Sequence, residues 1–339
     1  MEMTSATPLL SVVVIGRNEG ARLLRCLESV KAMDYPGEAV EVVYVDSASV
    51  DGSREVAERM GARVIPVISP KPTAAMGRNA GWHACSRPFV LFLDGDTILD
   101  PRFVADTLPD FDPDTAVAFG NRREIRSEAS VYNRVLDLDW ISPAGVADFC
   151  GGDALIRREV LDAVKGYDES LIAGEEPEMC RRMRELGWKI LHLDRPMTGH
   201  DLAMTRWSQY WRRSVRTGYA YAQVSERFRG SALPFWEAEA KHNRKHALVE
   251  AGLVMLALLA SIFWQTGWPI CLVAVFFLLL SLRTAAKVAW KSPSFSTRLL
   301  YGVHSHLQQI PIYFGQLQYR RDRRNGRIRE LIEYKGATQ

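Results

Sequence analysis

The sequence predicts an α/β domain with a mainly parallel sheet, followed by a helical membrane region. Two observations predict this class. Short β-branched runs alternate with helical segments in the N-terminal part of the 339 residues, and two almost uninterrupted apolar runs follow. The composition, 47% apolar and 24% charged, excludes a disordered chain. Lys and Arg (43) barely outnumber Asp and Glu (40), which argues against nucleic acid as a partner.

Four buried strands are predicted, each an apolar run that ends in polar turn residues. Helical segments separate them, with the sequences ARLLRCLESVKAM, REVAERM and AAMGRNAGWHAC. Strand–helix–strand units build parallel sheets, which bind ligands at the carboxyl ends of their strands. The polar residues that follow the strands should therefore share one rim. The predicted strands are LLSVVVI (9–15), VEVVYVD (40–46), ARVIPVI (62–68) and PFVLFLD (88–94).

Acidic residues follow these strands. Asp94, Gly95 and Asp96 leave the fourth strand, and two carboxylates beside a glycine favour Mg²⁺ or Mn²⁺ shared with substrate phosphates. Asp46 ends the second strand, where a carboxylate can accept hydrogen bonds from a nucleoside. Arg78 precedes the fourth strand, and its guanidinium suits a diphosphate. The alternatives are ordinary turns for the carboxylates and a solvated helix face for Arg78.

Two further motifs lie beyond the fourth strand. Glu175 and Glu176 precede Pro177 at a predicted helix start, where the helix dipole stabilises acidic side chains. A carboxylate at the rim of a pocket can also act as a general base. His200 is expected in a loop after the strand WKILHL (188–193), as a metal ligand, a group near the diphosphate or a structural histidine.

Two apolar runs predict a membrane hairpin. Residues 247–265 and 268–290 each approach the roughly 20 apolar residues that a spanning helix needs. Basic residues flank the pair, at 241–246 and 283–291, whereas the tip is uncharged. The positive-inside rule then predicts a multi-pass protein of the cytoplasmic membrane, with the N-terminal domain on the cytoplasmic side. The alternative is a buried hairpin in a soluble core.

The remaining C-terminal segments are amphipathic or basic. Residues 299–319 predict an interfacial or re-entrant helix with a break at Pro311. The tail that follows has six arginines in its first ten residues and suits an anionic lipid surface. Arg212 and Arg213, among aromatic residues, suit a diphosphate, a lipid phosphate or a helix lying on the bilayer. The predicted domains are 1–235 (the α/β domain), 236–319 (the membrane region) and 320–339 (the basic tail).

A resemblance to a known family is carried by segments in a fixed order: SVVVIGRNE, VYVDSASVDGS, GRNAG, LFLDGDT, CGGDALIRREVL, GYDE and GEEPEMCRRMRELGW. Together they resemble the inverting glycosyltransferases of family 2, which have the GT-A fold. The resemblance covers residues 9–215 and implies a single nucleotide-sugar-binding α/β domain.

The resemblance implies a donor site at the rim. Asp46 falls where the family holds the nucleoside, and Arg17, Glu19 and Arg78 fall beside the nucleotide. Asp94 falls on the Asp-x-Asp motif that holds the diphosphate. The implied donor is a nucleotide-diphosphate sugar. We expect UDP as the nucleotide, and the residues themselves leave GDP and dTDP open.

The same resemblance implies a metal site and a base. Asp96, the second carboxylate of the motif, is the expected ligand of a Mg or Mn divalent cation, with His200 as a further ligand. Glu176 falls on the general base, where the family usually has the shorter Asp. Around the acceptor or the diphosphate we expect Gly152, Asp153, Glu175, Arg212 and Arg213.

The expected reaction is the metal-dependent, inverting transfer of a single sugar to an acceptor hydroxyl, with Glu176 taking the proton. The membrane segments favour a lipid-linked sugar or a glycolipid as the acceptor, in surface polysaccharide assembly. One alternative is a subunit of a processive polysaccharide synthase, although residues 209–213 match the usual Gln-x-x-Arg-Trp motif only in part. The others are a sugar nucleotidyltransferase and a non-catalytic nucleotide-binding membrane scaffold.

Overall fold

The structure is a computed structural model that describes residues 9–327. The described chain divides into two compact units. The first contains the residues up to Ile125 together with Ser142–Leu202, and the second contains Arg126–Ile141 together with the residues from Ala203 onwards. The expected α/β domain, 1–235, therefore contributes to both units.

A nine-stranded sheet forms the first unit, with the strand order β3-β2-β1-β4-β8-β6-β9-β5 and with β7 paired to β9. Strands β1 to β4 run parallel, as do β6 and β9, whereas β8 lies antiparallel between β4 and β6. The four strands predicted from the sequence are β1 to β4, and the predicted α/β class with a mainly parallel sheet is confirmed. The strands are Leu10–Gly16 (β1), Val40–Asp46 (β2), Arg63–Pro66 (β3), Phe89–Asp94 (β4), Thr97–Leu99 (β5), Thr115–Glu124 (β6), Gly145–Ala147 (β7), Ala154–Arg157 (β8) and Lys189–His200 (β9).

Helices cover both faces of this sheet because side chains alternate along each strand. Val12 and Val14 of β1 pack in one cluster with α1, α2 and α4, and Val13 and Ile15 pack in another with α3, α6 and α7. A Cβ on Gly81 of α3 would overlap the side chain of Val13, so this glycine lets α3 lie close to β1. The helices are Ala21–Lys31 (α1), Ser53–Arg59 (α2), Ala74–His83 (α3), Phe103–Thr107 (α4), Arg158–Val164 (α6) and Glu175–Glu185 (α7).

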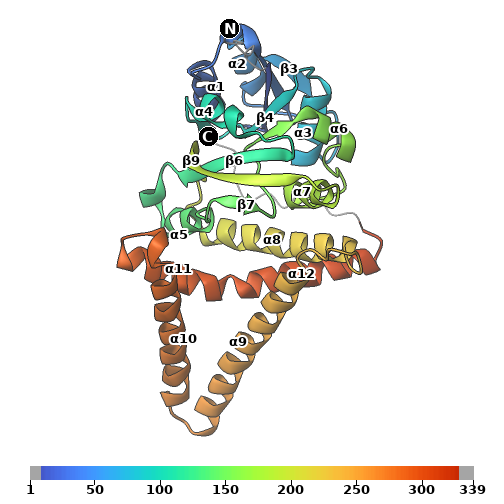
Figure 1. Ribbon diagram of the computed structural model, residues 1–339. Helices are drawn as coiled ribbons and strands as arrows, with labels where there is room; N and C mark the ends of the chain where they lie inside the picture. The colour runs from blue at the N-terminus through green and yellow to red at the C-terminus, as the bar shows by residue number, and fades with distance from the viewer. Residues whose placement is uncertain (1–8, 328–339) are drawn as a thin grey trace. The chain divides into compact units, whose positions relative to one another are not determined.

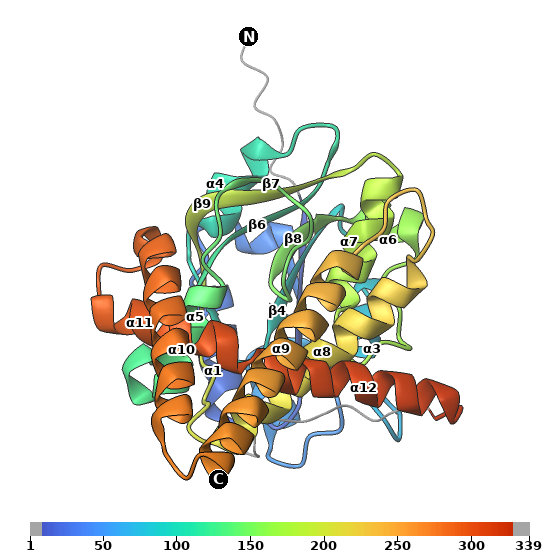
Figure 2. The same cartoon turned by 90° about the horizontal axis from the view of Figure 1, so that it is seen from below.

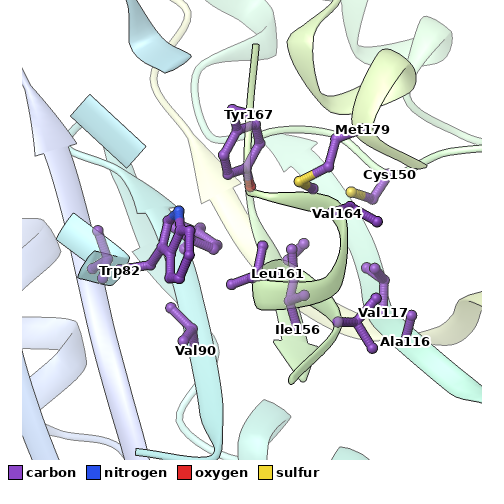
Figure 3. Close-up of a cluster of buried hydrophobic side chains, with 14 of the residues drawn as sticks. Trp82, Val90, Ala116, Val117, Cys150, Ile156, Leu161, Val164, Tyr167 and Met179 are labelled. Carbon is purple, nitrogen blue, oxygen red and sulfur yellow. The ribbon is translucent and has the colours of Figure 1, made fainter. Parts of the chain in front are cut away.

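Figure 3 shows the cluster under α3, α6 and α7. Trp82 of α3, Leu161 of α6 and Met179 of α7 are almost fully buried and belong to one apolar core with Tyr167. This core holds α7 against the sheet. The N-terminal turn of α7, which carries Glu175, is thereby fixed close to the end of β4.

The second unit is helical. Helices α8 and α12 lie side by side (Figures 1 and 2). A Cβ on Gly218 of α8 would overlap the carbonyl oxygen of Ile312, and one on Gly315 of α12 would overlap that of Val215. The two backbones therefore approach closely because glycine stands at both crossing points. The helices of this unit are Val131–Asp139 (α5), Trp207–Arg227 (α8), Glu237–Phe263 (α9), Trp268–Lys287 (α10), Phe295–Leu307 (α11) and Gln309–Arg324 (α12).

Helices α9 and α10 form a hairpin and diverge from its tip (Figure 1). Both are long and apolar enough to cross a membrane. Helix α9 begins ten residues before the expected segment 247–265, because no Gly or Pro interrupts residues 237–246. Large apolar side chains on both helices are exposed, among them Leu256, Ile262, Phe263, Leu272 and Leu279. Such a surface is typical of contact with a membrane or a partner.

The segment 299–319, expected as one broken helix, forms two helices, α11 and α12, which meet at Gln308. Pro311 lies in the first turn of α12. A proline ring there removes the hydrogen bond to Leu307 that a continuous helix would need, so the chain divides just before it. Of the expected basic tail, 320–339, residues 328–339 lie outside the described part of the chain.

Candidate active site

The carboxyl ends of β1, β2 and β4 meet at one rim, as the sequence predicts. In the sheet Gly16 is paired with Asp46 on one side, and Ile15 is paired with Asp94 on the other. The two predicted donor-binding carboxylates therefore flank the end of β1.

Asp46 is 1% exposed and is held in place from two directions. The Tyr44 hydroxyl donates to Oδ1 at 3.2 Å, and the Ser49 backbone N–H donates to Oδ2 at 3.1 Å. Asn18 ties the loops after β1 and β2 together, because its N–H donates to Ser49 Oγ and its side chain accepts from the N–H of Val50. Tyr44 and Asn18 are not among the predicted site residues, and the sequence signal for them is a polar side chain beside the end of a predicted strand.

The side chain of Arg78 lies at the centre of the site and is 2% exposed. Its guanidinium contacts three carboxylates: Asp94 Oδ1 at 2.9 Å, Glu176 Oε1 at 2.9 Å and Glu175 Oε1 at 3.2 Å. Burial opposes the charged form of Arg78, but Glu176 and Asp94 outweigh it and raise the pKa of Arg78 well above its ordinary value. One cation from α3 thus joins the Asp-x-Asp motif to the glutamates of α7.

A second arginine, Arg122 of β6, contacts the other oxygen of Asp94 at 3.1 Å and Asp153 Oδ2 at 3.5 Å. Asp153 accepts from the Asp94 backbone N–H at 3.0 Å and from the Thr198 hydroxyl at 2.7 Å. Burial raises the pKa of Asp153 despite Arg122. Arg122 and Thr198 belong to no motif recognised in the sequence. Only the order of β4, β8, β6 and β9 in the sheet brings them close.

Gly152 lies directly against the ion pair of Arg78 and Asp94. A Cβ on Gly152 would overlap Arg78 Nη2 and would lie 2.9 Å from Asp94 Oδ2. A Cβ on the neighbouring Gly151 would meet no atom within 4 Å. The overlap with Arg78 Nη2 explains why the chain needs glycine at 152.

Glu176 combines burial with charged neighbours. Burial, reinforced by Glu175, raises the pKa of Glu176 to about 7, against the effect of Arg78. Gly174, in the left-handed region with φ 81°, precedes the helix and directs the two glutamates toward Arg78. A carboxyl that titrates near neutral pH in a charged site is a candidate general base.

Asp96 and His200 also meet. His200 Nε2 lies 3.4 Å from Asp96 Oδ2, and its Nδ1 lies 3.8 Å from Glu124 Oε2. The expectation of a loop at His200 is wrong: β9 continues to His200, which pairs with Thr97 of β5 and with Glu124 of β6. The strand continues because both neighbours offer a ladder of hydrogen bonds.

The donor set at this point is a carboxylate oxygen and an imidazole nitrogen, which fits Mn²⁺ or a similar divalent ion. Within residues 9–327, no group of three or more His, Cys, Asp and Glu side chains is arranged to hold a metal. Asp96 and His200 would therefore supply two protein ligands, and a diphosphate would supply others.

The remaining predicted residues are Glu19, Arg17, Arg212 and Arg213, and of these Glu19 lies at the rim. Glu19 pairs with Arg22 at 2.9 Å, and its Cγ would lie 3.1 Å from a Cβ on Gly95, so it does line the rim. Arg17 is exposed in the loop after β1. Arg212 and Arg213 lie on α8, which belongs to the second unit.

A comparison with known sequences supports the family that these motifs indicate. Residues 11–165, which include β1 to β4 and the Asp-x-Asp motif, match the profile described as glycosyl transferase family 2. Residues 11–165 are therefore similar to the family 2 glycosyltransferase domain. The resemblance seen in the sequence is thereby confirmed.

Curated relatives match this chain at low identity. Glycosyltransferase AglE of Haloferax volcanii is 24% identical over 56% of this chain and 65% of its own length. The O-antigen biosynthesis protein RfbC of Myxococcus xanthus is 27% identical over 57% of this chain and 16% of its own length. The pre-mycofactocin glycosyltransferase of Mycobacterium tuberculosis is 26% identical over 57% and 42%. The chain thus spans less than two thirds of each of these relatives.

Two solved structures resemble this chain over most of both chains. Mannosyltransferase PcManGT from Pyrobaculum calidifontis, in complex with GDP-Man and Mn²⁺, has a TM-score of 0.64 at 18% identity, covering 92% of this chain and 88% of its own. S. aureus TarS 1-349, in complex with UDP-GlcNAc, has a TM-score of 0.51 at 15% identity, covering 94% and 92%. At these identities the likeness shows the fold, and the GT-A prediction is confirmed.

Proposed function

We propose that this protein transfers a single sugar from a nucleotide-diphosphate sugar to an acceptor hydroxyl, with inversion at the sugar carbon. The observation that carries this proposal is the cluster in which Arg78 contacts Asp94, Glu175 and Glu176. It joins a diphosphate-binding motif and a candidate base through one buried cation.

The donor binds at the rim of β1, β2 and β4. Asp46 keeps acceptor capacity for a nucleoside, because each carboxylate oxygen has two lone pairs and Tyr44 and Ser49 use one on each. Arg17, Glu19 and Asp94 line the same rim. We propose UDP as the nucleotide. The UDP-sugar complex of TarS supports this choice, and the GDP-Man complex of PcManGT makes GDP the main alternative.

A divalent cation, Mg²⁺ or Mn²⁺, would be held by Asp96 and His200. When bound, it supplies positive charge that stabilises the leaving nucleoside diphosphate. The Mn²⁺ in the PcManGT complex supports this assignment.

Glu176 acts as the general base. Its pKa of about 7 keeps a substantial ionised fraction at neutral pH while leaving it basic enough to accept a proton from a sugar hydroxyl. The ion pair with Arg78 orients the carboxylate. Attack by the deprotonated hydroxyl on the face opposite the leaving diphosphate inverts the configuration. Gly152, Asp153 and Glu175 shape the acceptor side.

The acceptor is a lipid-linked sugar or a glycolipid at the cytoplasmic membrane. The support is the hairpin of α9 and α10, whose apolar surface is exposed and whose basic residues all lie at the end away from the tip. We propose two spans, with the catalytic domain, 1–235, and the basic tail, 320–339, on the cytoplasmic side of the membrane region, 236–319. Arg212 and Arg213 would face the diphosphate or the lipid phosphate. The name of the O-antigen relative is consistent with surface polysaccharide assembly.

The test is a transfer assay on the full-length protein purified in detergent. A panel of UDP-, GDP- and dTDP-sugars is offered with Mg²⁺ or Mn²⁺ and a membrane-lipid extract, and nucleoside diphosphate and labelled product are measured. We expect release of one nucleotide and a product extended by one sugar. Asp96→Ala and Glu176→Gln should abolish both, whereas Glu185→Gln, at the far end of α7, should not. A product of many sugars would favour the processive synthase, and absence of both turnover and nucleotide binding would favour the scaffold.

A further inference from the structure

The open end of the membrane hairpin contains a cavity of about 550 Å³. Its walls come from α9, α10 and α11, all in the second unit. The volume falls in the range of about 300–1,000 Å³ that is typical of sites for small organic ligands. It therefore exceeds what a simple anion needs.

Cationic side chains line one part of this cavity: Lys245 of α9 and Arg283 and Lys287 of α10. All three are exposed, and within residues 9–327 no carboxylate forms an ion pair with any of them. The imidazoles of His242 and His246 stack beside Lys245, with ring centroids 4.0 Å apart. The cavity thus presents three cations that form no ion pair with a carboxylate of the described residues.

One acidic side chain, Glu250, lines the cavity, and it faces His306 of α11. The His306 Nδ1 atom lies 3.6 Å from Glu250 Oε1. Glu250 is buried, and its ion-pair contact among the described residues is with this histidine, whereas none joins it to the three cations. The cavity therefore has an excess of positive charge that suits a multiply charged anion.

The other walls are apolar, formed by Leu253 of α9 and by Phe276, Phe277 and Leu280 of α10. They continue toward the tip along the two helices that are long enough to span a bilayer. A cavity that is cationic at its mouth and apolar along its length matches a molecule with a charged head and a hydrocarbon chain. A free phosphate ion would leave the apolar part unfilled.

We propose that this cavity binds the phosphate headgroup of a membrane lipid phosphomonoester, with the start of the hydrocarbon chain along Leu253 and Phe277. Lys245, Arg283 and Lys287 contact the phosphate, and the pair of Glu250 and His306 closes the inner wall. The inference rests on the proposed membrane location of the hairpin and not on the sugar transfer. It can therefore fail or hold independently of catalysis.

The test is native mass spectrometry of the full-length protein in detergent, without any sugar donor. Phosphatidic acid, phosphatidylcholine with the same chains, and inorganic phosphate serve as probes. We expect retention of phosphatidic acid, at least about tenfold weaker retention of phosphatidylcholine, and no displacement by inorganic phosphate at the same concentration. Displacement by inorganic phosphate would indicate a simple anion site. Equal binding of both lipids would show that the cavity does not recognise a phosphomonoester, and either result would overturn the proposal.

Matched variants locate the site. Arg283→Gln and Lys245→Gln should each weaken binding of phosphatidic acid by about tenfold, the loss of one charge-assisted contact. Arg244→Gln removes an exposed cation next to Lys245 that does not line the cavity, so it should leave binding unchanged. Equal weakening by Arg244→Gln and Lys245→Gln would mean that general surface charge attracts the lipid, which would overturn the proposal. Thermal unfolding of each variant confirms that the fold is kept.

Discussion

Arg78 and Glu176 form an ion pair of 2.9 Å in a site where only 2% of Arg78 is exposed. The same guanidinium contacts Asp94 at 2.9 Å, so a candidate base and the first carboxylate of the Asp-x-Asp motif share one cation. When a ligand or a proton binds to one of these carboxylates, the electrostatic potential at the other changes. Donor binding and proton removal are therefore expected to be coupled through Arg78.

Arg78→Gln should strongly destabilise the protein. It would remove the cation that Glu175 and Glu176 contact and would leave Asp94 with Arg122 alone, and breaking a buried ion pair costs about 3–5 kcal/mol. Urea denaturation followed by circular dichroism measures the loss. Arg102→Gln, which removes an exposed ion pair with Asp106, should leave the free energy of unfolding unchanged. An equal free energy of unfolding in both variants would show that the ion pairs of Arg78 do not stabilise the fold.

The transfer rate should rise with pH through about 7, because Glu176 acts as a base only when ionised and its pKa is raised to about 7. The corresponding stability effect has the opposite sign. A carboxyl whose pKa in the folded state lies above its ordinary value of 4.5 binds more protons when folded, so its contribution to stability falls as the pH rises from 4.5 through 7.

The pH profile of kcat/KM measures the titration of Glu176 in the free enzyme. Any residual activity of Glu176→Gln should lack the rise near pH 7, whereas Glu185→Gln should keep it. A rise that persists in Glu176→Gln would assign the titration to another group.

Gly152→Ala should abolish most of the activity, because the added Cβ would overlap Arg78 and displace it from Asp94. Overpacking of this kind typically costs about 1–3 kcal/mol. The matched control is Gly151→Ala, whose Cβ would meet no atom within 4 Å. Steady-state transfer rates and donor binding by calorimetry compare the two. Equal transfer rates in the two variants would show that the backbone at Gly152 can shift to accept a Cβ without any loss of activity.

Removal of divalent cations with a chelator should abolish transfer, and added Mn²⁺ should restore it. His200→Gln should raise the Mn²⁺ concentration for half-maximal rate by at least about tenfold, since even the loss of an outer-shell partner weakens metal affinity by about 10–100-fold. His83→Gln, at the end of α3, is the control. An unchanged Mn²⁺ dependence in His200→Gln would leave Asp96 without its predicted partner ligand.

Much of the rim was predictable from the sequence because the information is local. Strands β1, β2 and β4 are continuous apolar runs that end at Gly16, Asp46 and Asp94, and parallel pairing places such ends on one edge. The two long apolar helices were predictable for the same reason, since length and composition are read directly from the chain.

The contacts between distant segments were not predictable. Arg78 and Glu175 are separated by 97 positions in the chain, and nothing in either neighbourhood indicates the other. Arg122 reaches Asp94 only because β8 lies between β4 and β6. The Thr-Gly-His-Asp sequence that contains His200 favours a loop. Pairing with β5 and β6 overrides that local preference.

The sequence by itself therefore determined the fold class, the strands of the parallel half, the rim and the two long apolar helices. Apolar periodicity and strand-end chemistry are properties of neighbouring residues, so they can be read from the chain directly. Tertiary structure decided that Arg78 contacts both Asp94 and Glu176 and that Arg122 contacts Asp94. It also decided that the three cations at the open end of the hairpin line one cavity. Such contacts depend on strand order and helix packing, which the burial of apolar surface across the whole chain selects.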